Sequence, residues 1–351
     1  MKVAVGLSGG VDSALAAALL KEQGYQVTGV FIECWNEPAS RLGGPGCRTD
    51  EDRKDALGVA LKLKIPFRVL DFKKEYKQKV LDWFYREYKK GRTPNPDIVC
   101  NQEIKFGMFL KWAIGNKPAS TRGESTRGGF DYMATGHYAR QQLCSLGGQA
   151  KLLMSADRQK DQTYFLAMLK QEQLNQVLFP IGHLLKKQVR LEAKKRGLAV
   201  WNKKDSSGIC FIGHDLNFRK FLKRKIKEHE GEAVDKKGQV IGKHQGFEFY
   251  TIGQRYAKPL FVIEKDIKNN RLIVGSKKDL EKKEFAVEGW SWINSLQVRN
   301  LQVRIRHQGR LMPCKIVGEN VFLKQAGYGI APGQVAVIYH GLECLGGGTI
   351  I

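Results

Sequence analysis

Short apolar runs alternate with longer amphipathic stretches over roughly the first 140 residues of the chain. Each run has the length of a buried strand, and each stretch has the spacing of a helix with one buried face. The pattern predicts strands at Lys2–Leu7, Gln26–Glu33, Phe67–Asp71 and Phe130–Thr135, with helices at Ser13–Gln23 and Asp50–Lys64. Because alternation with short connections is typical of a doubly wound parallel sheet, we expect an α/β domain here.

The pattern changes along the rest of the chain. Helices are predicted at Asp161–Lys170, at Lys186–Arg196 and around an apolar face made of Phe218, Phe221, Leu222 and Ile226. Short β-type runs follow after about Glu230, at Gln239–Ile241, Phe261–Ile263, Leu272–Val274, Val303–Ile305, Val321–Leu323 and Val335–Tyr339. They predict two small β-rich modules, the last one barrel-like. We therefore expect domains at residues 1–213, 214–278 and 279–351.

The stretch between Ile114 and Phe130 has a different composition. It is rich in Gly, Ser, Thr and Arg, and it repeats Ser-Thr-Arg-Gly at 120–123 and 125–128. No apolar residue is available to anchor it, so its composition is typical of a flexible surface insertion without a function of its own.

An excess of positive charge points to a polyanionic partner. Lys and Arg number 59 against 35 Asp and Glu, which gives a formal net charge of +24. Basic residues outnumber acidic ones by 14 to 5 between Lys186 and Glu230, and by 8 to 3 between Lys73 and Arg92. Generic solubility would also explain a basic chain, but clustering favours nucleic-acid binding.

The remaining composition narrows the class of protein. No apolar run approaches the roughly 18 to 20 residues that span a bilayer, and the N-terminus lacks the organisation of a signal peptide. We therefore expect a cytoplasmic protein without a membrane segment. The seven cysteines form no C-x-x-C pair, which argues against zinc fingers and disulfide scaffolds and predicts no metal site of that kind.

A glycine-rich loop, Ser8-Gly9-Gly10-Val11-Asp12-Ser13, follows the first predicted strand and opens the first predicted helix. Glycines let a phosphate approach the backbone closely, and the helix N-terminus offers N–H groups that bind anions. The loop does not end in Gly-Lys-Ser/Thr, so it differs from the P-loop of kinases. The alternative is an ordinary strand–helix turn.

Two cysteines lie in motifs that suit chemistry. Asp97 precedes Cys100 by three residues after two prolines that stiffen the chain, and an acid beside a thiol is suited to acid–base work. Cys210 lies in Asp205-Ser206-Ser207-Gly208-Ile209-Cys210, inside the basic segment, where a positive field lowers the pKa of a thiol. Taken alone, the motif of Cys100 favours a buried structural residue, and that of Cys210 is equally consistent with a structural or a chemical role.

The Ser-Gly-Gly-x-Asp-Ser loop resembles that of enzymes that split ATP into AMP and pyrophosphate, the PP-loop pyrophosphatases. With the other motifs, the chain closely resembles the tRNA-specific 2-thiouridylase family (MnmA/TrmU) over nearly its whole length. These motifs are Pro94–Cys100, Ala134–Tyr138, Lys160–Gln162, Asp205–Gly213, Pro332–Gln334 and Gly346–Gly348. The chain departs from the family in the 114–130 insertion and in Ile32, where the family often has methionine.

The resemblance implies a domain of the adenine nucleotide α-hydrolase type that binds ATP, with Mg²⁺ expected. The residues implied for ATP binding are Gly6, Leu7, Ser8, Gly9, Gly10, Val11, Asp12, Ser13, Ile32 and Gly136. The implied reaction is adenylation of the C2 oxygen of the wobble uridine in tRNA, followed by replacement of that oxygen with sulfur. Cys210 is implied to carry the sulfur as a persulfide, Cys100 to be the paired thiol, and Asp97 to manage protons.

The resemblance also implies the partners. The flipped uridine would meet Asn95, Pro96 and Asp97, and further tRNA contacts are implied at His137, Lys160, Asp161, Gln162, Arg304, Ile305, Arg306 and Gln334. A persulfide donor or relay protein would supply the sulfur.

Three alternatives remain open at this stage. A PP-loop enzyme that adenylates a small molecule would share the loop, but it would need neither the paired cysteines nor the charge. A non-catalytic RNA-binding module would not need Asp12, Cys100 and Cys210 together. Finally, Asp97, Cys100 and Cys210 could hold an iron–sulfur cluster, because thiolates are the usual cluster ligands.

Overall fold

A computed structural model describes residues 1–35, 49–115, 129–143, 149–205, 218–294 and 299–351. The chain forms two compact units, each built from several segments. Unit 1 contains Met1–Val80, Asp97–Asp215 and Leu342–Cys344, and unit 2 contains Leu81–Pro96, Leu216–Gly341 and Leu345–Ile351. The 114–130 insertion falls almost entirely outside the described residues, as do Cys210 and most of its motif.

A five-stranded parallel sheet organises unit 1, in the order β3-β2-β1-β4-β7. Its strands are β1 (Lys2–Gly6), β2 (Gln26–Glu33), β3 (Phe67–Asp71), β4 (Tyr132–Ala134) and β7 (Val177–Leu178). Val3, Ala4 and Val5 of β1 are fully buried, as expected for the central strand of a sheet that is covered on both faces. The predicted doubly wound α/β fold is confirmed.

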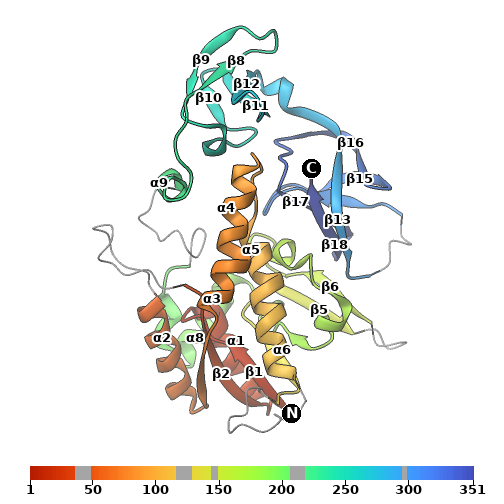
Figure 1. The fold of residues 1–351 in the computed structure, drawn as a ribbon. Coiled ribbons are helices and arrows are strands. Elements are labelled where there is room, and N and C mark those ends of the chain that lie inside the picture. The colour runs from red at the N-terminus through yellow and green to blue at the C-terminus, as the bar shows by residue number, and fades with distance from the viewer. Residues whose placement is uncertain (36–48, 116–128, 144–148, 206–217, 295–298) are drawn as a thin grey trace. The chain divides into compact units, whose positions relative to one another are not determined.

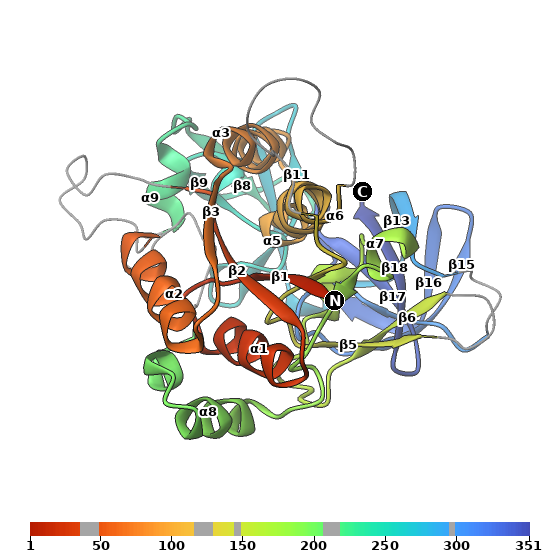
Figure 2. The ribbon, with the colours of Figure 1, turned by 90° about the horizontal axis from the view of Figure 1, so that it is seen from below.

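Helices cover both faces of this sheet (Figure 2). One face carries α1 (Val11–Glu22), α2 (Thr49–Leu63) and α8 (Lys186–Lys195), and the other carries the π-helical η3 (Cys100–Phe109) with α6 (Leu110–Ile114). Helix α1 packs closely because Ala14, Ala16, Ala17 and Ala18 are buried and present only methyl groups. Unit 1 also contains the short helices α3 (Lys73–Tyr76), η4 (Thr163–Leu166), α7 (Gln171–Leu174) and η5 (Ala199–Asn202). A hairpin joins β5 (Ala139–Leu143) to β6 (Ala150–Met154). The helix η2 (Lys77–Leu81) begins in unit 1 and ends in unit 2.

The prediction of a helix at Asp161–Lys170 is wrong. That segment contains only the short 3-10 turn η4, followed by α7 from Gln171. The backbone N–H of Gln162 donates to the Tyr138 carbonyl, and its side-chain oxygen accepts from the Tyr138 N–H. These long-range hydrogen bonds hold the backbone at Gln162 away from a continuous helix, and the local sequence does not reveal them.

Unit 2 contains two β structures. The first is a five-stranded sheet in the order β10-β11-β12-β8-β9, and the second is a barrel in the order β13-β16-β15-β14-β17-β18 that closes where β13 pairs with β18 (Figure 1). This confirms two β-rich parts after the α/β domain, the last a closed barrel. The strands are β8 (Gly231–Val234), β9 (Val240–His244), β10 (Arg255–Ala257), β11 (Leu260–Asp266), β12 (Arg271–Gly275), β13 (Glu281–Trp292), β14 (Gln302–Arg304), β15 (Met312–Val317), β16 (Asn320–Tyr328), β17 (Val335–His340) and β18 (Glu343–Ile350).

Residues Leu81–Pro96 belong to unit 2 because their side chains contact it. Helix α4 (Asp82–Lys89) packs its aromatic rings on those of α9 (Phe218–Lys223), with Tyr85 stacked on Phe221 at 5.5 Å between ring centroids. Arg92 pairs with Glu288 at 2.7 Å. The short helix α5 (Pro96–Val99) therefore begins in unit 2 and continues into unit 1. The 3-10 turns η6 (Phe247–Phe249) and η7 (Lys277–Leu280) complete unit 2.

Candidate active site

The glycine loop lies at the carboxyl end of β1, as its sequence predicts. Gly9 has a φ of +74°, a left-handed conformation that glycine adopts without strain. A side chain at Gly9 would also collide with the backbone of Asp52. Helix α1 then begins at Val11, so its first N–H groups face the loop. The backbone is therefore shaped to bind an anion such as a phosphate.

Two serine hydroxyls hold the loop in this shape. Ser13 Oγ accepts a hydrogen bond from the Ser8 N–H at 3.1 Å and donates to the Gly10 carbonyl at 3.1 Å. The hydroxyls of Ser8 and Ser13 are 3.2 Å apart. Ser13 is buried, whereas Ser8 is exposed and can turn toward a ligand.

The other residues predicted to bind ATP lie at the same edge of the sheet. The strand order reverses between β1 and β4, and in doubly wound sheets ligands bind in the crevice at this switch point. Gly136 follows β4 and packs on the loop so closely that a Cβ there would lie 2.5 Å from the Ser13 nitrogen. Ile32 lies near the carboxyl end of β2 and is half-buried.

An ion network surrounds Asp12. The Lys186 ammonium lies 2.8 and 2.7 Å from the two Asp12 carboxylate oxygens and 2.9 Å from Asp205 Oδ1. Tyr138 donates its hydroxyl to Asp12 Oδ1 at 2.9 Å. Asp205 also accepts hydrogen bonds from Lys160 at 2.8 Å and Arg190 at 2.7 Å.

The network perturbs the pKa of Asp205. Burial opposes ionisation of this carboxyl, but the hydrogen bonds from Lys160 and Lys186 outweigh burial and lower its pKa to about 2. Sequence reasoning did not identify Lys186 or Arg190. The available signal was the periodicity of α8, which places residues four apart on one face of the helix.

The acid and the thiol predicted for catalysis lie one helical turn apart. Asp97 is in α5 and Cys100 begins η3. Burial raises the pKa of Asp97, although the positive charge of Lys105 partly opposes that rise. Asp97 therefore keeps its proton to a higher pH than an exposed carboxyl does, and so can still have a proton to donate.

Cys100 has a partner that the sequence did not indicate. It is 5% exposed, and a hydrogen bond with the Cys34 thiol lowers its pKa against the opposing effect of burial. The charge of Lys105 lowers that pKa further, and the charge of Asp97 raises it. Cys34 directly follows β2, so the fold of unit 1 brings the two thiols together.

The motif around His137 and Lys160–Gln162 is inside unit 1 and largely buried. The His137 Nδ1 atom lies 2.8 Å from Thr135 Oγ1, and burial keeps the pKa of His137 well below its usual range. Asp161 is 2% exposed and accepts hydrogen bonds from the Ser155 N–H and the Thr163 hydroxyl. The Lys160 side chain is 41% exposed and is available to a partner, in contrast to the buried Asp161.

The remaining residues predicted to contact tRNA lie in unit 2. Arg304 ends β14 and places its guanidinium 5.1 Å from the Tyr339 ring centroid, Ile305 is buried, and Arg306 is exposed. Gln334 donates to the Thr93 carbonyl at 2.6 Å. Asn95 and Pro96 lie in the same unit and lead directly into Asp97.

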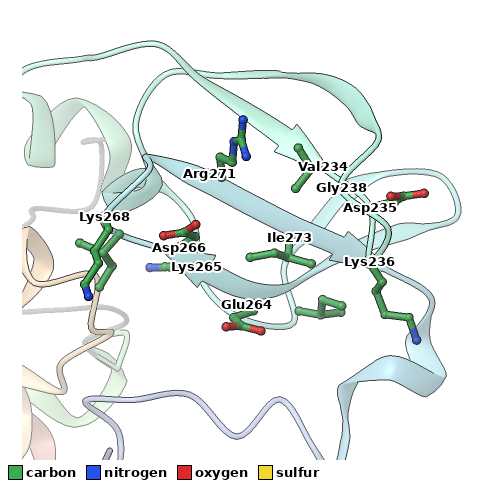
Figure 3. Close-up of a pocket in the computed structure, with 12 residues that line it drawn as sticks. Val234, Asp235, Lys236, Gly238, Glu264, Lys265, Asp266, Lys268, Arg271 and Ile273 are labelled. Carbon is green, nitrogen blue, oxygen red and sulfur yellow. The ribbon is translucent and has the colours of Figure 1, made fainter.

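An open pocket of about 630 Å³ lies in the β8–β12 sheet of unit 2, and none of the residues above lines it (Figure 3). Its charged lining is mixed and consists of Asp235, Lys236, Glu264, Lys265, Asp266, Lys268 and Arg271. Lys265 donates to the Gly91 carbonyl at 2.9 Å, and burial lowers its pKa to about 8.

Across the ranges that the structure describes, no three His, Cys, Asp or Glu side chains are grouped to hold a metal ion. Within the same ranges, no helix is both long enough and apolar enough to cross a membrane.

Comparison with known proteins gives one consistent result. Residues 1–214 match the family described as tRNA methyl transferase HUP domain, residues 219–276 its PRC-barrel domain, and residues 282–350 the Aminomethyltransferase beta-barrel domain. The chain is 40% identical over 368 residues to the tRNA-specific 2-thiouridylase MnmA of Bacillus subtilis (strain 168), covering 99% of this chain and 94% of that protein. It is 42% identical over 371 residues to the protein of the same name from Listeria monocytogenes serotype 4b (strain CLIP80459), covering 100% and 94%. The resemblance seen in the motifs is therefore confirmed, and the chain belongs to the MnmA family of tRNA-specific 2-thiouridylases.

Proposed function

We propose that this protein uses ATP to replace the C2 oxygen of the wobble uridine in tRNA with sulfur. The observation that carries the proposal is the combination, in one unit, of a phosphate-binding loop and an acid–thiol turn in a member of this family. A PP-loop enzyme acting on a small molecule would need the loop alone.

The first half of the reaction takes place at the loop. ATP lies along Gly6–Ser13 with its base near Ile32 and Gly136, and its phosphates accept hydrogen bonds from the N-terminus of α1. The uracil C2 oxygen attacks the α-phosphate and pyrophosphate leaves, so the base is joined to AMP. Asp12 would hold Mg²⁺, which would supply neutralisation of part of the phosphate charge.

The second half transfers sulfur. Cys210 carries a persulfide, and the Cys100 thiolate attacks the Cys210 sulfur and releases the outer sulfur as hydrosulfide. The hydrosulfide displaces AMP from C2, leaving 2-thiouridine and a Cys100–Cys210 disulfide that an external thiol reduces. The lowered pKa of Cys100 favours the thiolate, and Asp97, whose pKa burial raises, gives and takes the protons of this step.

tRNA binding relies on basic side chains, through phosphate contacts that do not read sequence. Several basic residues between Lys186 and Glu230 already pair with acids of the protein, which reduces the charge available to RNA. These are Lys186, Arg190, Lys195, Arg196, Lys203 and Lys223. Arg306, Lys160 and Gln334 supply further contacts, and a persulfide-bearing donor protein in the cytoplasm loads Cys210.

The proposal is tested by incubating the protein with ATP, a persulfide source and a tRNA transcript, and measuring 2-thiouridine by mass spectrometry. We expect product with iron-free protein, and peptide mapping without reductant is expected to show a Cys100–Cys210 disulfide. A Cys314→Ser control is expected to form the same disulfide, because Cys314 lies in the barrel of unit 2. Thiolation that strictly requires iron would contradict the persulfide route and favour a cluster. Pyrophosphate release without any need for RNA would favour a small-molecule substrate.

A further inference from the structure

Lys186 reaches Asp12 of the phosphate loop from 174 positions further along the chain, and Lys203 donates to the Gly9 carbonyl of the loop at 3.1 Å. Lys186 is the first residue of α8, and its backbone N–H donates to Asp157 Oδ2 at 2.9 Å. Its side chain is only 13% exposed and ends between the carboxylates of Asp12 and Asp205. The start of α8 therefore fixes the direction in which this side chain extends.

The loop lacks a cation of its own. Ser8–Ser13 contains no lysine or arginine, whereas the P-loop of kinases ends in a lysine that reaches the phosphates. Backbone N–H groups and the serine hydroxyls bind phosphate oxygens, but a polyphosphate carries several negative charges and is bound best with a charged donor. Lys186 places an ammonium within 2.8 Å of Asp12, in the first turn of α1.

We propose that Lys186 binds the polyphosphate of ATP and the departing pyrophosphate, and that Asp205 is the residue that positions it. The assignment rests on the proposed use of ATP at this loop. Asp12 would be available to hold Mg²⁺, which would neutralise part of the phosphate charge, and the Lys186 ammonium, still paired with Asp205, would then donate to a phosphate oxygen. The ammonium then stabilises the negative charge that develops on pyrophosphate as the bond to the α-phosphate breaks.

Asp205 is itself held in place from two other directions. Lys160 and Arg190 donate to it, and Arg190 also donates to the carbonyls of Trp201 and Lys203 at 3.0 and 2.9 Å. These contacts restrict the carboxylate and, through it, the Lys186 ammonium. Such restriction lowers the entropy lost when the lysine binds a ligand.

The test is isothermal titration of the full chain with Mg-ATP, Mg-pyrophosphate and AMP. Lys186→Met is compared with Lys187→Met, an exposed neighbour in the same helix. We expect Lys186→Met to weaken ATP and pyrophosphate binding by about ten- to a hundredfold, the range of a hydrogen bond to a charged group, and to leave AMP binding within about twofold. Lys187→Met is expected to bind all three ligands like the unmodified chain. Lys186→Arg is expected to recover part of the pyrophosphate affinity, and Asp205→Asn to lose part of it.

Unchanged pyrophosphate binding in Lys186→Met overturns the proposal, and so does an equal loss for AMP, which would mean that the lysine only supports the fold. If Lys186→Met does not fold, as judged by thermal denaturation, Asp205→Asn decides. The proposal then requires that Asp205→Asn binds pyrophosphate more weakly and binds AMP with unchanged affinity. Selective loss of pyrophosphate binding in a protein that makes no 2-thiouridine would contradict the proposed function and leave the role of Lys186 intact.

Discussion

The phosphate loop (Ser8–Ser13) and the acid–thiol turn (Asp97 and Cys100) belong to the same unit, but the protonation of their ionisable groups is set in different ways. Around the loop, charged groups are fixed in pairs, with Lys186 between Asp12 and Asp205. At the turn, burial raises the pKa of Asp97, while one thiol–thiol hydrogen bond lowers that of Cys100. The loop is thus suited to holding a ligand of constant charge. The turn is suited to groups that gain and lose protons during a reaction.

The largest effect is expected from substitutions that separate adenylation at the phosphate loop from sulfur transfer by the cysteines. These are substitutions of Asp12 and Cys210. Asp12→Ala removes the carboxylate that holds Lys186 and Tyr138, so we expect tRNA-dependent pyrophosphate release to fall by about a hundredfold or more. Cys210→Ser is expected to keep pyrophosphate release and to yield no 2-thiouridine. A pyrophosphate assay and nucleoside mass spectrometry measure the two activities separately. Loss of both activities in Cys210→Ser would show that adenylation and sulfur transfer cannot be separated.

A smaller effect, confined to the phosphate side, is expected from Gly136→Ala. The added methyl group would lie 2.5 Å from the Ser13 nitrogen and must displace the loop. We expect ATP affinity, measured by titration, to fall by about tenfold, which corresponds to roughly 1.4 kcal/mol, while the thiolate fraction of Cys100 is unchanged. Gly58→Ala in α2 is the matched control, because a Cβ there meets no atom within 4 Å. Equal affinity in both variants would mean that Gly136 does not shape the loop.

The smallest effect is expected on the thiol side. Cys34→Ala removes the hydrogen bond that lowers the pKa of Cys100 and leaves burial to raise it, so the thiolate should form only at higher pH. Alkylation of Cys100 by iodoacetamide, followed by peptide mapping across a pH series, should slow by roughly a few-fold at neutral pH. Cys34→Ser retains a hydrogen-bond donor and is expected to resemble the unmodified chain. A profile that does not move in Cys34→Ala would assign the reactivity of Cys100 to Lys105 instead.

The elements that carry the loop could be predicted because their signals are local. The boundaries of Gln26–Glu33 and Phe67–Asp71 agree with the prediction, whereas the place of Gly136 near the loop was implied only by the resemblance to the family. Periodicity and glycine placement are properties of neighbouring residues, so a single sequence contains them.

The interactions between side chains could not be predicted, because they join residues far apart in the sequence. The ion pair of Lys186 with Asp12 and the approach of Cys34 to Cys100 both depend on how the helices pack on the parallel sheet. The burial of His137 and Asp161 has the same origin, since only the folded unit determines which face of a motif points inward. A charge count likewise does not reveal that Arg190 and Lys203 already have acidic partners.

Closure of the barrel has a consequence for how the protein is made. The ribosome produces β13 first among the barrel strands, and β18, which pairs with it to complete the ring, last. During translation one edge of β13 stays unpaired while four intervening strands emerge, and an unpaired edge can pair with another chain. Glu288, on the part of β13 that pairs with β18, has a charged side chain that is 46% exposed. Charges of this kind discourage such pairing, so the nascent barrel has protection until its last strand arrives.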